Sequence, residues 1–145
     1  MYKHILVPDD GSDLSAKAVE HGVALAKAVN ATVTGVTVTT PFHVFAVEPG
    51  MVTDTPEQYA VHVASRASKY LGRISVAAAA AGVKCDVLHI EHDQPYRAII
   101  DAAGRRGCDL IVMASHGRRG VSAVVLGSET LKVLTHSTIP VLVCR

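Results

Sequence analysis

Hydrophobic and polar positions alternate along the chain in two different patterns. Short apolar runs rich in Val, Ile and Leu, bounded by turn-forming residues, predict strands, whereas apolar residues that recur every three or four positions predict amphipathic helices. The runs predict strands at residues 3–8, 31–38, 83–90, 108–115 and 139–145. The helical spacing predicts one helix from about residue 12 that Asn30 closes and one from residue 56 with Gly82 as its C-cap. It predicts a third helix that begins near Pro95 and ends before Gly107, and a fourth from the predicted cap at Ser128 to about residue 136.

Strand and helix signals alternate from one end to the other, which predicts an α/β fold in one domain over residues 1–145. Continuously apolar strands separated by helices form a parallel sheet with helices on both faces. Right-handed crossovers then give a doubly wound five-stranded sheet, for which we expect the order 3-2-1-4-5. A ligand would bind beyond the carboxyl ends of the strands, where the winding reverses between the first and fourth strands.

Composition and charge narrow the function classes. Of the 145 residues 49% are hydrophobic and 4% aromatic, and the formal net charge is +1. Such a chain lacks the basic surface and stacking platforms of a nucleic-acid-binding protein, and no apolar run approaches the roughly 20 residues of a membrane span. Three widely spaced cysteines, Cys85, Cys108 and Cys144, predict reduced and mostly buried thiols in a cytoplasmic protein.

The segment ASHGRRGVSAVVLGSET leads from the fourth strand into the fourth helix. Ser128 is predicted to cap that helix, so that the next three amides, of Glu129, Thr130 and Leu131, have no partner within the helix. Unpaired amides at a helix N-terminus attract anions, Gly127 would let the backbone approach a phosphate, and the hydroxyls of Ser128 and Thr130 could donate to its oxygens. The alternative is an ordinary capped helix behind a flexible loop.

The turn after the first strand, PDDGSD, is rich in acidic residues. The turn offers Asp9, Asp10, Ser12 and Asp13, and an acidic side chain at the carboxyl end of a strand can accept hydrogen bonds from ribose hydroxyls, as in dinucleotide folds. The alternative is a turn in which Ser12 or Asp13 caps the following helix. The chain has no GxxxxGK[ST] motif and no GxGxxG after the first strand, which argues against a Walker-type ATPase and a dinucleotide dehydrogenase.

Eight histidines raise the question of metal binding or catalysis. In the segment HIEHD, His89 and Glu91 would share one face of a strand while His92 points the other way, so no metal site is predicted. His116 could contact a phosphate, but the sequence shows no evident nucleophile beside it, and no catalytic residue is assigned.

The two loops and the spacing between them resemble the universal stress protein family over essentially the whole chain. The resemblance lies in KHILVPDDGSDLSAKAVEHGVALA at the start and in DLIVMASHGRRGVSAVVLGSETLKVLTHSTIPVLV at the end. The nucleotide-binding branch of that family carries Gly, two residues, Gly, nine residues, and then Gly-Ser or Gly-Thr. Here the frame reads Ala114, Gly117, Gly127 and Ser128, so that only its first position departs.

The resemblance implies a role for each matching position. Asp10 would lie near the ribose and adenine, Val38 would pack on the adenine, and Met113 and Ala114 would lie under the nucleotide. The positions from Gly117 onward would surround the phosphates. The candidate nucleotide-binding residues are Pro8, Asp10, Val38, Met113, Ala114, His116, Gly117, Arg118, Gly127, Ser128, Glu129 and Thr130.

Three departures bear on this expectation. The methyl group of Ala114 would crowd the ligand, and an alanine there is unstrained only with a negative φ. Asp9 and Glu129 add negative charge where an anion would bind, which Arg118 and Arg119 would offset.

We therefore expect a protein that binds an adenine nucleotide, ATP or AMP, and acts as a stress-response sensor or regulator, not primarily as a catalyst. Mg²⁺ would bind through the phosphates, and the ligand would order the long connection of residues 39–56. The alternatives are an interaction module of the same fold that binds no nucleotide, and a weak nucleotide hydrolase. The apolar last strand would lie at a sheet edge, and the resemblance implies a homodimer through it. No nucleic-acid or membrane partner is expected.

Overall fold

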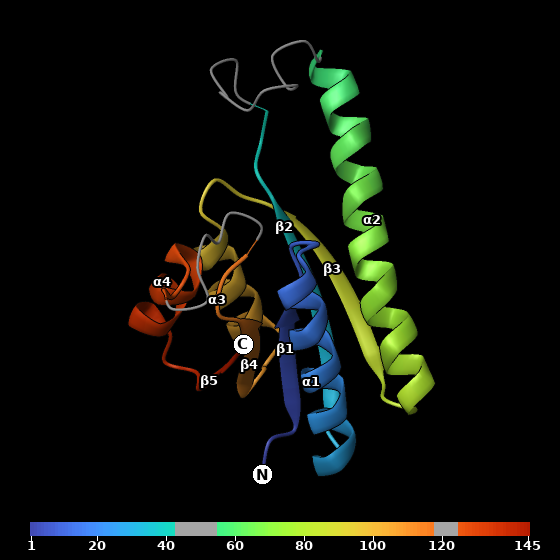
Figure 1. Cartoon of the computed structure of the whole chain (residues 1–145), viewed down its shortest axis with the longest axis vertical. Coiled ribbons are helices and arrows are strands. Elements are labelled where there is room, and N and C mark those ends of the chain that lie inside the picture. Colours follow the sequence, from blue (N-terminus) through green and yellow to red (C-terminus); the bar gives the residue numbers. More distant parts are fainter. Residues whose placement is uncertain (43–54, 118–124) are drawn as a thin grey trace.

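The computed structural model describes residues 1–42, 55–117 and 125–145, which form five strands and four helices (Figure 1). In chain order these are β1 (His4–Pro8), α1 (Asp13–Val29), β2 (Thr32–Thr39), α2 (Pro56–Ala81), β3 (Cys85–Glu91), α3 (Pro95–Arg105), β4 (Leu110–Ala114), α4 (Ser128–His136) and β5 (Val141–Cys144). Most of the long connection expected to respond to a ligand lies outside the described residues, as do Arg118 and Arg119.

The strands form one parallel sheet in the order β3-β2-β1-β4-β5, which confirms the predicted topology. β1 lies at the centre, where Leu6 pairs with Thr34 of β2 on one side and with Ile111 of β4 on the other. From β1 the strands follow in the order β2, β3 on one side and β4, β5 on the other. The carboxyl ends of β1 and β4 therefore meet where the winding reverses.

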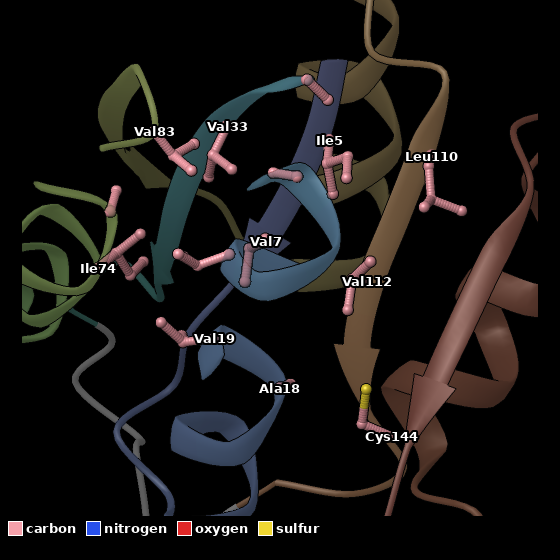
Figure 2. Packing of buried hydrophobic residues seen from close by; sticks show 14 of the residues in the cluster. Ile5, Val7, Ala18, Val19, Val33, Ile74, Val83, Leu110, Val112 and Cys144 are labelled. Carbon is pink, nitrogen blue, oxygen red and sulfur yellow. The ribbon is translucent and has the colours of Figure 1, made fainter. Parts of the chain in front are cut away.

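Helices cover both faces of the sheet, as predicted. Val7 belongs to a buried cluster with Ile74 of α2 and with residues of α1 (Figure 2). Its neighbour Leu6 faces the opposite side and packs with Ile99 of α3 and Val133 of α4. Because successive side chains of a strand point to opposite faces, this two-sided burial explains why the inner strands are continuously apolar.

Local signals set the helix ends. Asn30 closes α1 in the left-handed conformation with a φ of 58°, and Gly82 closes α2 with a φ of 69°. Ser12 caps α1 by accepting a hydrogen bond of 3.1 Å from the backbone N–H of Ser15. The fifth strand is shorter than predicted and begins at Val141, after a proline that has no N–H to donate to a strand partner.

The helix α2 is the longest element, with 26 residues, and therefore measures about 39 Å. It packs on β2 and β3 and begins at the end of the sheet where β2 ends (Figure 1). The hydroxyl of Tyr59 donates a hydrogen bond of 2.8 Å to the carbonyl oxygen of Thr40, just past β2. The first turns of α2 are thereby held beside the carboxyl ends of the strands.

The thiols are largely shielded. Cys108 and Cys144 are buried, Cys85 is half-buried, and none of them forms a disulfide. Burial raises the pKa of the Cys108 thiol to about 11. Among the helices that the structure describes, none combines the length and apolarity needed to span a bilayer.

Candidate functional site

A cavity of about 630 Å³ opens at the carboxyl ends of β1, β2 and β4, against α2 and the start of α4. Its volume is typical of a small-molecule site, for which roughly 300–1,000 Å³ is usual. The described lining residues are Pro8, Asp9, Asp10, Ser15, Val36, Thr37, Val38, Thr39, Thr40, Pro41, Tyr59, Val63, Arg66, Ala67, Tyr70, Pro95, Ile99, Met113, Ala114, His116, Gly117, Gly127, Ser128, Glu129 and Thr130.

The predicted nucleotide-binding residues come together in this cavity. They arrive from the end of β1, from β2, from the end of β4 and from the start of α4. Those that line it are Pro8, Asp10, Val38, Met113, Ala114, His116, Gly117, Gly127, Ser128, Glu129 and Thr130. Arg118 lies outside the described residues. Contact of these side chains with a nucleotide stays a prediction.

Two glycines allow the loops of the cavity to approach closely. A Cβ atom on Gly117 would overlap the Oδ2 atom of Asp10, so the carboxylate lies directly against this glycine. A Cβ atom on Gly127 would lie 2.9 Å from the Cα atom of His116 and 3.2 Å from the carbonyl oxygen of Ser115. A side chain at Gly117 would therefore displace the Asp10 carboxylate, whereas one at Gly127 would press on backbone atoms that cannot turn aside.

The start of α4 differs from the prediction by one residue. Gly127 is the N-cap, with a φ of −62° and a ψ of 151°, and Ser128 is already the first helical residue. The N–H of Gly127 donates to the carbonyl oxygen of Ser115 at 2.7 Å, and its carbonyl oxygen accepts from Leu131 at 2.9 Å. The helix therefore starts earlier, and the amides without an intrahelical acceptor belong to Ser128, Glu129 and Thr130, not to Leu131.

The hydroxyl of Thr130 makes a hydrogen bond within the protein. The residue is buried, and its Oγ1 atom donates a hydrogen bond of 2.8 Å to the carbonyl oxygen of Ala114. Donation of this proton to a phosphate would compete with the bond to Ala114, because a hydroxyl carries only one proton, and it stays a prediction. The backbone amide of Thr130 keeps its place in the first turn of α4.

The methyl group of Ala114 is accommodated by the core. Within the described residues only Asn30 combines a side chain with a positive φ, so the backbone of Ala114 is unstrained. Ala114 is 7% exposed and belongs to the buried cluster that also contains Val112 and Cys144. The departure from the glycine frame therefore costs no backbone strain.

Glu129 uses its carboxylate on the neighbouring helix. Its Oε2 atom accepts a hydrogen bond of 2.9 Å from the backbone N–H of Tyr96, in the first turn of α3. Its Oε1 atom lies 3.5 Å from the Nζ atom of Lys132. A carboxylate at a helix N-terminus is stabilised by the helix dipole, so the charge of Glu129 is compensated on the side of α3.

Asp9 is compensated as well, by a residue that sequence reasoning missed. Asp9 is 2% exposed, and both of its carboxylate oxygens accept hydrogen bonds from the guanidinium of Arg73 in α2. The hydrogen bond to Asp9 raises the pKa of Arg73 above its usual value. The expected repulsion between Asp9 and an anionic ligand is therefore largely cancelled, because the carboxylate is already paired.

Asp10, in contrast, reaches the exposed side of the same turn. Its Oδ1 atom accepts hydrogen bonds from the N–H of Ser12 at 2.9 Å and from the hydroxyl of Ser15 at 2.7 Å. These two bonds direct the other oxygen, Oδ2, toward Gly117 across the reversal point of the sheet. Both aspartates line the cavity, but the Asp9 carboxylate is buried and paired with Arg73, whereas Asp10 is exposed.

The wall contributed by α2 was not predicted as part of the site. Tyr59, Val63, Arg66 and Tyr70 line the cavity. The apolar positions of this helix carry the same periodicity that a core-facing helix shows, so the sequence indicated burial only. The guanidinium of Arg66 makes no hydrogen bond or ion pair with the residues that the structure describes.

The histidines that the structure describes do not assemble a metal centre. The Nε2 atom of His89 lies 2.7 Å from the Thr39 hydroxyl, and Nδ1 of His92 accepts from the N–H of Gln94 at 2.8 Å. No three His, Cys, Asp or Glu side chains are grouped to hold a metal ion within residues 1–42, 55–117 and 125–145. His116 lines the cavity, with its Nδ1 atom 3.3 Å from the Ser115 hydroxyl.

Comparison with known proteins adds an independent finding. The model of the universal stress protein family matches residues 1–145. The universal stress protein YxiE of Bacillus subtilis is 32% identical over 149 residues, which cover 100% of both chains. The structure of universal stress protein UspA from Lactobacillus plantarum has a TM-score of 0.73 and 26% identity, and it covers 99% of this chain and 98% of its own.

Two further structures of this fold are described as nucleotide complexes. A universal stress protein in complex with cAMP has a TM-score of 0.69 and 24% identity, covering 98% of this chain and 95% of its own. The universal stress protein from Archaeoglobus fulgidus in complex with dAMP has a TM-score of 0.70 and 18% identity, covering 99% and 98%. At these identities the likeness establishes the shared fold.

Proposed function

Since the chain belongs to the universal stress protein family, we propose that its cavity binds an adenine nucleotide and that the protein acts as a stress-response sensor or regulator. The observation that carries the proposal is the meeting of Asp10 with Gly117 beside the first turn of α4. A hydrogen-bond acceptor and a helix N-terminus then line one cavity at the reversal point of a parallel sheet, where nucleotides bind in folds of this kind.

Different residues of the cavity suit the ribose, the phosphates and the base of a nucleotide. The Asp10 carboxylate suits the ribose hydroxyls, which need an acceptor. The amides of Ser128, Glu129 and Thr130 lie at the positive end of the α4 dipole and suit the phosphates. Val38 and Met113 offer apolar surface for the base. The cAMP and dAMP complexes of two proteins with this fold support the same ligand class.

Charge compensation makes the cavity suitable for an anion. Arg73 pairs with Asp9, while Tyr96 and Lys132 engage Glu129, so neither acid presents an unpaired carboxylate to the phosphates. Mg²⁺ would bind mainly through phosphates and water, which needs no protein cage. We propose ATP as the physiological ligand on the same grounds, with AMP as the smaller alternative.

Calorimetry with ATP, ADP and AMP tests the proposal. We expect wild-type protein to bind ATP, and Asp10→Ala to weaken binding about tenfold, since a hydrogen bond to a charged group contributes about 1.5–3 kcal/mol. Asp13→Ala is the matched control, because this exposed carboxylate in the first turn of α1 does not line the cavity. Absence of heat and of a thermal shift at millimolar nucleotide would exclude nucleotide binding. Phosphate release above background would instead favour the hydrolase alternative.

We also propose a homodimer through β5 in a cytoplasmic protein. β5 pairs with β4 and ends the sheet, and Leu142 on it is 43% exposed. An apolar strand at a sheet edge favours pairing with a second chain. Light scattering should give a dimer for wild type and for Val87→Asp on β3, and a monomer for Leu142→Asp. A monomeric wild type at micromolar concentration would refute this assembly.

A further inference from the structure

We propose that Arg73 is a positioning residue that acts through Asp9 and Ser15 to fix the Asp10 carboxylate for recognition of the ribose hydroxyls. This inference rests on the proposed nucleotide-binding function and concerns the preference of the cavity for ribose over 2′-deoxyribose. Arg73 lies on α2, 64 residues further along the chain than Asp9.

The guanidinium of Arg73 holds the turn between β1 and α1 at several points. Its Nε and Nη2 atoms donate to the two oxygens of Asp9. Nη2 also donates to the carbonyl oxygen of Ser12 at 3.1 Å. The Asp9 side chain is fully buried, whereas that of Arg73 is 33% exposed. A planar guanidinium on two carboxylate oxygens has little freedom to move, so α2 fixes the geometry of the turn.

Ser15 connects the two aspartates. This serine is buried, and its Oγ atom lies 3.0 Å from Oδ1 of Asp9 and 2.7 Å from Oδ1 of Asp10. A hydroxyl carries one proton and can make only one strong donation at a time. The two carboxylates therefore compete for the same proton with each other and with the carbonyl oxygen of Ser12 at 3.1 Å, and the shortest of these contacts is with Asp10.

Arg73 decides that competition. With the guanidinium in place, both oxygens of Asp9 accept from it, and Oδ1 also accepts from the N–H of Gly11 at 2.9 Å. Asp9 is thus satisfied without the proton of Ser15. Without Arg73 a buried carboxylate would lack its counter-charge, which is strongly unfavourable, and would attract the Ser15 proton. Asp10 would then lose the hydrogen bond from the Ser15 hydroxyl, which helps to direct its Oδ2 atom toward Gly117.

The predicted consequence is specific to the sugar. A loosened Asp10 would recognise the ribose 2′-hydroxyl less well, while contacts to the base and the phosphates would persist. A merely stabilising ion pair would instead lower the melting temperature and leave the preference between ATP and 2′-deoxyATP unchanged. The ratio of the two affinities therefore distinguishes a positioning role from a structural one.

The experiment measures Kd for ATP and for 2′-deoxyATP by calorimetry, with a melting curve for each variant. We expect wild type to prefer ATP by about tenfold or more, as for a hydrogen bond to a charged acceptor. Arg73→Gln should weaken ATP binding by about tenfold and change 2′-deoxyATP binding little, so that the preference approaches one. Lys69→Gln removes the same charge from an exposed position of α2 and should keep the wild-type ratio.

A double variant tests the route through Asp9. In Asp9→Asn with Arg73→Gln the buried charge is removed together with its partner, which often restores stability. We expect the preference for ATP to return to within about threefold of wild type. Arg73→Lys keeps the charge but cannot bridge both oxygens, so its ratio should be intermediate; this milder variant serves if Arg73→Gln does not fold.

The outcomes separate the two proposals. A wild type that binds neither nucleotide overturns the proposed function itself. A wild type that binds ATP and 2′-deoxyATP equally well overturns the recognition of the ribose 2′-hydroxyl by Asp10, and with it the role of Arg73. A wild type that prefers ATP, with Arg73→Gln or Arg73→Lys retaining the same ratio, overturns the positioning role alone.

Discussion

Glu129, in the first turn of α4, accepts a hydrogen bond of 2.9 Å from the backbone N–H of Tyr96, in the first turn of α3. One carboxylate thereby joins the N-terminal ends of the two helices that cover the same face of the sheet. The family resemblance places Glu129 near the phosphates, but its side chain makes a contact between two helices. Its substitution should therefore affect stability first.

We expect Glu129→Ala to lower the free energy of unfolding by about 1 kcal/mol, because α3 loses a charged acceptor at its positive end. Glu129→Gln keeps an acceptor oxygen and should lose about half as much. Urea denaturation measures both, with exposed Glu20→Gln on α1 as the control. Equal stability of Glu129→Ala and wild type would contradict the role in joining the helices.

Gly127→Ala should be destabilising by about 1–3 kcal/mol, because the added methyl group meets backbone atoms that cannot move aside. The contacts are at 2.9 Å to the Cα atom of His116 and 3.2 Å to the carbonyl oxygen of Ser115. Nucleotide affinity should fall with it, since α4 must shift away from β4.

Gly104→Ala is the matched control for that substitution. Gly104 lies inside α3, and a Cβ atom there has no neighbour within 4 Å. Alanine should stabilise the helix at this position by about 0.5–1 kcal/mol. Thermal melting compares the two variants, and a shift of the same sign for both would refute the steric argument.

Ala114→Gly would restore the glycine frame, yet we expect no gain in nucleotide affinity beyond about twofold. The methyl group of Ala114 belongs to the buried cluster and the backbone there is unstrained, so glycine only removes packing and adds chain entropy. Stability should fall by about 1 kcal/mol. A tenfold increase in affinity would mean that the methyl group obstructs the ligand after all.

The thiols should differ in their reaction with iodoacetamide. Burial raises the pKa of Cys108 to about 11, so at pH 8 only about a thousandth of it is the reactive thiolate. Cys85 is half-buried and should be labelled first. Between pH 8 and 10 the labelling rate of Cys108 should rise about tenfold per pH unit, because each unit below the pKa multiplies the thiolate fraction by about ten.

Intact-mass measurements follow this labelling, and Cys85→Ser should remove the fast phase. Rapid labelling of Cys108 at pH 8 under native conditions would contradict the burial of its thiol. Unfolded protein in urea, where all three thiols are exposed, gives the reference rate for each.

The fold was predictable because its signals are local or follow from general topology. Apolar runs mark the strands, and Asn30 and Gly82 end two helices through the left-handed conformation. The rule that ligands bind at the carboxyl ends of strands, at the reversal point, was enough to bring Asp10 and Gly127 to the same cavity. Such inferences need no knowledge of side-chain packing.

The parts that could not be predicted depend on distant contacts. Nothing in the sequence pairs Arg73 with Asp9, because their proximity exists only once α2 packs on the sheet. Ser128 has the residue type of an N-cap, but the bond from the Gly127 N–H to Ser115 sets the start of α4 one residue earlier. The periodicity of α2 likewise indicated a buried face without revealing that part of that face lines a cavity.

Two hydrogen bonds tie the first turn of α4 to the end of β4: one from the Gly127 N–H to Ser115, the other from the Thr130 hydroxyl to Ala114. The amides between them are therefore already oriented before any ligand arrives, so that an anion meets a preorganised site. Little conformational entropy remains to be lost at this end of the cavity. Nucleotides that differ only in the number of phosphates should accordingly differ in enthalpy of binding more than in entropy.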